Sequence, residues 1–259
     1  MFSRSKKSFK KGIKQVVAVW FAFVAVWFAF VAVWFAFAAV NIASANLIIN
    51  GSFEQLTFDD NSTSQGQVHN RYLSDFENMN SGWDVFSIIP GWETTFGSGI
   101  EIQKHVVTNA QHGHNHVELD SHPGGASNSM MQQMLESLVV GNQYQLEFFY
   151  KPRTNNQNDN GINVYWYDSL VDFDSSIDPL YSVDGVRRDA NGWQVQTVTF
   201  TATSEDMTLG FASFGQQNRL GGLIDNVSLV AVPEPSMIVL LMLALLAMMS
   251  KKARIGRRA

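Results

Sequence analysis

Between residues 46 and 231 the chain is built from short apolar or alternating runs, separated by glycine, asparagine, aspartate and serine. The clearest run is Gln143–Tyr150, where Tyr144, Leu146 and Phe148 alternate with polar residues. Because successive side chains of a strand point to opposite faces, this pattern buries one face of the strand. Several short strands joined by turn residues are typical of a β-sandwich. The middle of the chain is therefore predicted to be one all-β domain.

Nine segments of this region predict strands. They are Leu47–Ile49, Gly99–Gln103, His116–Leu119, Ser129–Met134, Gln143–Tyr150, Ile162–Tyr167, Trp193–Thr201, Met207–Phe214 and Leu223–Val230. About nine strands around one core favour a jelly roll over an immunoglobulin-type sandwich. Within Trp193–Thr201 the apolar phase shifts between Val195 and Val198, which predicts a β-bulge.

Charge is distributed unevenly along the chain. Of the 18 basic residues, six lie in residues 1–45 and five in residues 236–259, and neither end contains an acid. Residues 46–235 therefore combine seven basic residues with all 23 acids, a net charge of −16. Such a domain repels nucleic acid, so no nucleic-acid partner is expected, and it should avoid polyanions unless calcium bridges them. The lack of cysteine excludes thiol catalysis and Cys-ligated zinc.

The N-terminus has the organisation of a secretory signal. Basic residues precede an uncharged apolar run, Val16–Val40, which is followed by Ala43-Ser44-Ala45, an A-x-A cleavage pattern. Residues 1–45 are therefore predicted to be a signal peptide, cleaved after Ala45 during export by the Sec machinery. The run is also long enough to span a bilayer, so an uncleaved anchor is the alternative.

The C-terminus, residues 232–259, combines three features in a fixed order. Pro233-Glu234-Pro235 comes first, the apolar stretch Met237–Met249 follows, and five basic residues end the chain. The basic cluster is expected to stay on the cytoplasmic side of the membrane. This order resembles the PEP-CTERM sorting signal, whereas an ordinary membrane anchor would not explain Pro-Glu-Pro. The resemblance implies a C-terminal transmembrane helix held transiently in the inner membrane and removed by an exosortase.

The middle domain contains motifs in an order that resembles the DUF642 family of cell-wall-associated proteins. They are Asn46–Glu54, Pro90-Gly91-Trp92, Val117–Asp120, Tyr150–Arg153, Asn191-Gly192-Trp193 and Gly221–Leu229. The first and last motifs are also similar to the opening and closing strands of galactose-binding-like jelly rolls, found in many carbohydrate-binding modules. The resemblance implies a jelly-roll β-sandwich over residues 46–231.

This resemblance places Glu54 and Asp225 in the first and last strands, which lie close together in the fold class. A structural calcium commonly bridges those strands there, and carboxylates suit calcium. A calcium ion held by Glu54 and Asp225 is therefore one expectation. The alternative is that the two carboxylates only accept hydrogen bonds from turn amides.

A second candidate metal site is the cluster His112, His114 and His116. Alternate residues of a strand point the same way, so the three imidazoles could face one metal ion. The alternative is a solvated loop whose histidines bind nothing. Gly113 and Asn115 between them favour the loop.

Aromatic rings are candidate sugar contacts, because the C–H face of a pyranose packs against them. The candidates are Trp83, Trp166, Tyr165 and Tyr167. Trp166 points opposite to its two neighbours, so one face of that strand should be exposed or covered by a loop. Trp92 and Trp193 lie within the family motifs and are expected in the core. Packing is the alternative for every one of these rings.

We therefore expect an exported, non-catalytic module on the cell surface or in the extracellular matrix of a Gram-negative bacterium. Its expected partner is an extracellular polysaccharide, neutral or amino-bearing. One alternative is a small glycan-acting enzyme that uses paired carboxylates of an acidic loop. Those carboxylates are Asp168, Asp172, Asp174, Asp178 and Asp184. The other alternative is a purely structural surface protein. No G-x-S-x-G, H-E-x-x-H or P-loop motif occurs.

Overall fold

The computed structural model describes residues 20, 27, 45–59, 65–122, 128–174, 176–187 and 192–233. Ser44–Val232 form one compact unit, which contains every strand described below. Ala43, Glu234, Pro235 and the predicted helices at the two ends, apart from Trp20 and Trp27, lie outside the described residues, so cleavage and sorting stay predictions. Across the described part of the chain, no helix has the length and apolarity needed to cross a membrane.

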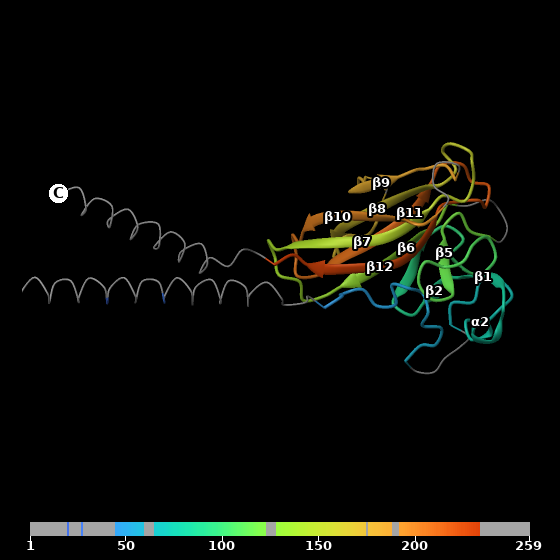
Figure 1. The fold of residues 1–259 in the computed structure, drawn as a ribbon, viewed down its shortest axis with the longest axis horizontal. Coiled ribbons are helices and arrows are strands. Elements are labelled where there is room, and N and C mark those ends of the chain that lie inside the picture. Colours follow the sequence, from blue (N-terminus) through green and yellow to red (C-terminus); the bar gives the residue numbers. More distant parts are fainter. Residues whose placement is uncertain are drawn as a thin grey trace, which may run out of the picture. The chain divides into compact units, whose positions relative to one another are not determined.

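The domain is a sandwich of two six-stranded antiparallel sheets (Figure 1). Sheet A contains, in spatial order, β1 (Gly82–Phe86), β4 (Ile100–Lys104), β5 (Asn115–Glu118), β12 (Leu223–Ala231), β7 (Gln143–Lys151) and β10 (Gln194–Thr201). Sheet B contains β2 (Ile88–Ile89), β3 (Trp92–Phe96), β6 (Met130–Leu135), β11 (Met207–Phe214), β8 (Gly161–Asp168) and β9 (Tyr181–Val183). A short helix, α2 (Asp75–Asn78), precedes β1. The predicted all-β jelly roll is confirmed.

The core lies between the sheets and follows the alternation seen in the sequence. In β7 every second residue from Tyr144 to Tyr150 is buried, as predicted. Phe148 of sheet A meets Phe211 of sheet B edge to face, with ring centroids 5.1 Å apart. Trp92 packs on the same Phe211 ring at 6.0 Å and is buried, as expected. Interlocking aromatic rings therefore join the two sheets at the centre of the sandwich.

Two predicted features of the strands are wrong. Leu47–Ile49 is not a strand, although Leu47 N–H donates to the Leu229 carbonyl beside it (2.9 Å). The chain turns immediately afterwards, because Asn50 has a φ of 51° and Phe53 a φ of 59°. The predicted bulge in β10 is also absent, since its register with β7 is continuous over Gln194–Thr201.

The apolar phase of β10 shifts because Val195 is an apolar residue on the outward face, where it is 52% exposed. The register irregularity occurs in β12 instead, between Asp225 and Ser228. Sequence reasoning also missed β1, β2, β3 and β9, which have two to five residues each. Strands this short offer too few alternations to be distinguished from loops.

Candidate functional site

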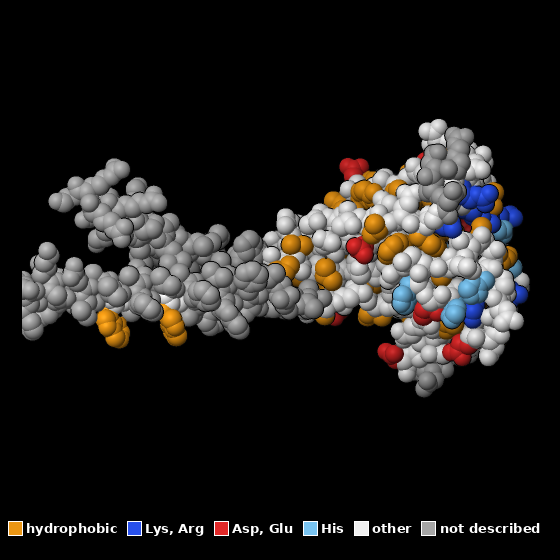
Figure 2. Space-filling model, in the orientation of Figure 1, with side chains coloured by type: hydrophobic (Ala, Val, Ile, Leu, Met, Phe, Trp, Pro, Cys, Tyr) orange, Lys and Arg blue, Asp and Glu red, His pale blue; other side chains and the backbone are white. Residues whose placement is uncertain are grey.

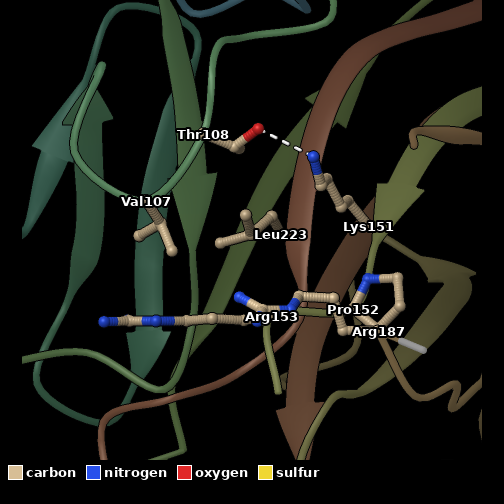
Figure 3. A pocket seen from close by; sticks show the side chains of 7 residues that line it. All are labelled: Val107, Thr108, Lys151, Pro152, Arg153, Arg187 and Leu223. Carbon is tan, nitrogen blue, oxygen red and sulfur yellow. Dashed lines mark hydrogen bonds between the residues drawn. The ribbon is translucent and has the colours of Figure 1, made fainter. Parts of the chain in front are cut away.

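A cavity of about 330 Å³ opens where β7 ends and β12 begins (Figure 3). Three cationic side chains line it: Lys151, Arg153 and Arg187. The other lining residues are Val107, Thr108, Pro152 and Leu223. These residues come from four separate segments, which the fold brings together. We call this site the basic cavity; it contains three of the seven basic residues of the acidic stretch 46–235.

Two of the three cations in the basic cavity form no salt bridge with any residue that the structure describes. Lys151 Nζ donates to Thr108 Oγ1 at 2.7 Å, the contact drawn in Figure 3. Burial lowers the pKa of Lys151, and the nearby Arg187 guanidinium lowers it further. Within the described ranges, neither Lys151 nor Arg187 has a carboxylate within salt-bridge distance. Positive charge is thus concentrated here without local compensation.

Arg153, the third cation, is bound to a buried carboxylate. Its guanidinium donates to Glu118 Oε2 and to the Arg219 carbonyl, the latter at 3.0 Å. Glu118 is fully buried, and its other oxygen accepts the Gly221 N–H at 2.6 Å. Burial raises the pKa of Glu118 to about 8, while Arg153 acts in the opposite direction. The ion pair fixes Arg153 at one side of the cavity.

Glu118 belongs to a polar network on the outer face of sheet A. Glu101 of β4 lies directly opposite Glu118 of β5 in the strand register. Gln103 Nε2 donates to both carboxylates, at 2.8 Å to Glu101 Oε1 and at 2.5 Å to Glu118 Oε2. Period-two alternation places these polar residues outward and Ile102 and Val117 inward. All three network residues are nevertheless buried, because loops cover this face.

One covering segment is the chain between β4 and β5, while His122 and Arg153 cover Glu101 and Glu118. Trp193 Nε1 donates to the Asn109 carbonyl at 3.0 Å, and Lys151 donates to Thr108 of the same segment. Trp193 is therefore half-buried on the outer face of sheet A, and its expected place in the core is wrong. Because this segment also supplies Val107 and Thr108, its anchoring shapes the wall of the basic cavity.

Glu54 and Asp225 are brought near one another at the same covering segment. Glu54 Oε1 accepts the N–H groups of His114 and Asn115, at 2.7 and 2.6 Å. Asp225 Oδ2 accepts those of Gln111 and His112, at 2.6 and 2.9 Å. Burial raises the pKa of Asp225 to about 7, and the Glu54 carboxylate adds to the increase.

These contacts correspond to the turn-amide alternative, and the other Asp225 oxygen, Oδ1, accepts the Asn226 N–H at 2.6 Å. A glycine is required at 113, since it has a φ of 70° and a Cβ would lie 2.4 Å from the Glu54 carboxyl carbon. Glu54 lies outside the strands, not in a first strand as expected. In the parts of the chain that the structure describes, no three His, Cys, Asp or Glu side chains are grouped to hold a metal ion. Calcium binding by Glu54 and Asp225 stays a prediction.

The three clustered histidines have different environments. Only His116 lies in a strand, because β5 begins at Asn115, so the argument from strand alternation does not apply to His112 and His114. His116 is fully buried, with its ring 5.7 Å from that of Trp193. Burial lowers the pKa of His116 to about 3, with Lys151 and Arg153 adding to the effect. Its ring nitrogens have no hydrogen-bond partner among the described residues.

The candidate stacking rings all contact the protein's own side chains. Trp83 packs against His69, with parallel rings 5.4 Å apart, and against His122 at 4.6 Å. Both imidazoles are held by carboxylates, since His69 Nδ1 lies 3.1 Å from Asp84 and His122 Nδ1 lies 3.2 Å from Glu101. The Trp83 ring is therefore flanked by two side chains that are themselves fixed, and it remains partly exposed.

The other three rings lie on β8. Tyr165 and Tyr167 are 8% exposed and pack against Phe173, at 4.9 and 5.8 Å, so a loop covers this face of sheet B. Trp166 points the opposite way, lies 4.3 Å from Phe200 and donates to the Thr201 carbonyl at 3.1 Å. These contacts correspond to the packing alternative for all three rings.

Two of the five acidic loop carboxylates bond to their own turns. Asp168 Oδ1 accepts the Leu170 N–H at 2.9 Å, and Asp174 Oδ1 accepts the Ser176 N–H at 2.7 Å. Asp184 Oδ2 accepts the Asn158 N–H at 3.2 Å, whereas Asp172 and Asp178 are exposed. Such local bonds are typical of turn stabilisation. The carboxylates that do converge, Glu101 and Glu118, were not among the predicted site residues.

Sequence reasoning also missed the three cations of the basic cavity. One signal was present: in a stretch with seven basic residues, five lie between positions 151 and 219. Two of the quoted motifs, Val117–Asp120 and Tyr150–Arg153, also contain Glu118, Lys151 and Arg153. Glu118, Lys151 and Arg153 come together because β12 pairs with both β5 and β7. The sequence does not reveal this strand order.

Two curated relatives are Multifunctional-autoprocessing repeats-in-toxin proteins. The chain is 28% identical over 169 residues to that of Vibrio vulnificus, and 29% identical over 148 residues to that of Vibrio cholerae serotype O1. These matches cover 65% and 56% of this chain. The chain spans only 3% of the length of either toxin.

Among solved structures, similar ones include a Stig cyclase of Fischerella (16% identity, TM-score 0.46), covering 74% of this chain and 99% of the cyclase. The adhesin domain of Lys-gingipain from Porphyromonas gingivalis has 16% identity and a TM-score of 0.43, covering 60% of this chain and all of the adhesin domain. A carbohydrate-binding module in complex with β-1,4-galactotriose has 15% identity and a TM-score of 0.39, covering 73% of this chain and all of the module.

The match to a protein family covers a longer part of the chain. Residues 46–230 match the family described as "Protein of unknown function (DUF642)", and this match covers the whole sandwich up to the last residues of β12. The matched region also includes every lining residue of the basic cavity. Because the match extends over well more than half of its length, the chain belongs to the DUF642 family.

Proposed function

We propose that the sandwich is a non-catalytic carbohydrate-binding module of an exported protein, and that its glycan binds at the basic cavity. The observation that carries this proposal is the composition of the cavity wall. Charged donors line one part of it, and Val107, Pro152 and Leu223 supply apolar surface. A sugar ring presents both hydrogen-bonding groups and an apolar C–H face, so it matches such a wall.

The buried carboxylates beside the cavity support a binding role over catalysis. A glycosidase needs two carboxyl groups free to exchange protons with substrate or water. Glu101 and Glu118 are instead both bound by Gln103, and Glu118 also accepts bonds from Arg153 and Gly221. In this arrangement the carboxylates position the cavity wall.

Binding is tested with the full-length chain, purified in detergent because of its apolar ends, on a glycan array. We expect micromolar to millimolar affinity, about −8 to −4 kcal/mol, for at least one polysaccharide. Release of new reducing ends from a bound polymer would favour the enzyme alternative. Absence of any glycan binding, with the fold verified by circular dichroism, would favour the purely structural alternative.

Export and sorting form the second part of the proposal. Its support is the arrangement of the two ends, with the A-x-A pattern at Ala43–Ala45 and Pro233-Glu234-Pro235 before the apolar stretch. In the native host we expect the mature protein to begin at Asn46 and to yield no peptide from Met237–Ala259 by mass spectrometry. An intact tail on protein recovered from the cell surface would contradict the sorting proposal.

A further inference from the structure

The basic cavity concentrates positive charge in a domain that is otherwise strongly acidic. Lys and Arg side chains gather towards one end of the domain, whereas Asp and Glu are scattered (Figure 2). Among the residues that the structure describes, no acidic side chain lines the cavity. Arg187 lies close enough to Lys151 for its guanidinium to lower the pKa of the Lys151 amine. Neither residue forms a salt bridge within the described ranges.

Like charges held together raise the free energy of the folded state unless an opposite charge compensates them. Arg153 is occupied by its hydrogen bonds to Glu118 and to the Arg219 carbonyl, and Glu118 bonds to no other cation of the described residues. Lys151 and Arg187 are therefore the two cations available to a ligand. A bound anion would relieve their repulsion and gain charge-assisted hydrogen bonds.

We propose that the basic cavity selects an anionic sugar, a uronate or a sugar sulfate, with Lys151 and Arg187 binding its negative group. This inference rests on the proposed carbohydrate-binding function and specifies its ligand class. It reverses the expectation of a neutral or amino-bearing glycan, which was based on net charge. Exposed charges more than about 10 Å apart are largely screened at 0.1 M salt, so the local cluster outweighs the net charge of the domain.

The size and the apolar part of the wall favour a sugar over an inorganic anion. The cavity, at about 330 Å³, is within the range of roughly 300–1,000 Å³ that is typical of small-molecule sites. An inorganic sulfate or phosphate would leave the partly exposed Val107 in contact with water. A sugar ring that carries the charge would cover this side chain while its acidic group meets the cations.

The experiment compares two polymers that differ only in charge: polygalacturonate and the same polymer after its carboxyl groups have been reduced to alcohols. A sulfated galactan provides a second anionic arm, and sodium sulfate provides the inorganic anion. Binding to the full-length chain is measured by calorimetry. We expect polygalacturonate or the sulfated galactan to bind at least about tenfold more tightly than the reduced polymer, and less tightly at high salt.

The variants test which cations are responsible. Arg187→Gln and Lys151→Gln should each weaken binding of the anionic polymer about tenfold or more, while Arg187→Lys should retain most of it. Gln143→Glu is the matched control, since it also lowers the net charge by one. Gln143 is exposed at the other end of β7, about 27 Å from Lys151 at roughly 3.4 Å per residue. This variant should bind as the unaltered chain does.

The outcomes separate this inference from the proposed function. Equal binding of the charged and reduced polymers, or full binding by Arg187→Gln, would overturn anion selection and leave carbohydrate binding intact. Binding of sodium sulfate without binding of any anionic polymer would also overturn it. Absence of binding to every glycan would reject the proposed function itself.

Discussion

The outer faces of the two sheets are both covered by loops, but in opposite ways. On sheet B, Tyr165 and Tyr167 form an apolar cluster beneath Phe173 and its loop. On sheet A, the covered residues are polar, with Glu101 and Glu118 at the centre of their network. The apolar side chains on sheet B pack against one another, whereas the polar face of sheet A has a charged cavity at its edge. The proposed recognition site therefore lies on sheet A, and the apolar cover of sheet B is expected to contribute stability.

The physical reason lies in what each kind of cover requires. Apolar surface gains about 25 cal/mol per Å² when it leaves water, whatever its partner. A buried polar group must find a specific partner, so each bond also fixes a direction. Thr108 and Arg153 are held by such bonds, and they line the basic cavity.

The largest expected effect tests the sheet B cover. Tyr165→Ala should lower the free energy of unfolding by about 3 kcal/mol, because it removes a buried aromatic ring from beneath Phe173. Urea denaturation measures this loss, and Tyr165→Phe should show much less of it. Glycan affinity should not change in either variant. A parallel loss of affinity would show that the two faces do not have separate roles.

The next largest expected effect is the gain in stability from calcium binding at the loop over sheet A. If Glu54 and Asp225 bind the ion, a hundredfold excess of calcium over its dissociation constant should add about 2.7 kcal/mol of stability. Thermal melting in calcium should then exceed melting in chelator, and Asp225→Asn should remove the difference. Identical melting temperatures would mean that the amides of residues 111–115 hold these carboxylates without a metal.

The pH dependence of stability tests the polar network. Burial raises the folded-state pKa of Glu118 to about 8, from an ordinary value of 4.5. The folded state therefore keeps a proton that the unfolded state releases, and this contribution to stability is lost as the pH rises through 8. Between about pH 6.5 and pH 8 the unfolding free energy should fall by about 1–2 kcal/mol.

Two variants make this measurement specific. Asp225, with its pKa raised to about 7, contributes a smaller loss in the same pH window. Glu118→Gln should remove most of the pH dependence, whereas Asp172→Asn, at an exposed acid, should leave it unchanged. A flat stability profile in the unaltered chain would contradict the assignment of a retained proton to this network.

The smallest expected effect concerns Trp83 at the edge of sheet A. Trp83→Phe should reduce stability by about 1 kcal/mol, because it weakens the packing against His69 and His122. Glycan affinity should stay within about twofold of the unaltered chain, since a ring flanked by two fixed side chains leaves little surface for a sugar. A tenfold loss of affinity would instead support the stacking role predicted from the sequence.

The sequence determined the parts of this protein that depend on local pattern. Period-two alternation identified β7 and most of the longer strands, and the opposite direction of Trp166 from its neighbours followed from the same rule. The order of the motifs indicated the family. The uneven charge of the chain was also visible, but net charge alone led to the expectation of a neutral or amino-bearing ligand.

Only the tertiary structure decided which residues meet. Lys151 and Arg187 are 36 positions apart in the chain, and Glu118 lies 33 positions before Lys151. β12 lies between β5 and β7 and so brings the segments of Glu118 and Lys151 together, while the Arg187 N–H donates to the Thr154 carbonyl just after β7. Tertiary packing likewise determined that Trp83 is flanked by histidines and that Glu118 is buried. The physical reason is that alternation depends on the backbone of one strand, whereas strand order and loop cover depend on the packing of the whole sandwich.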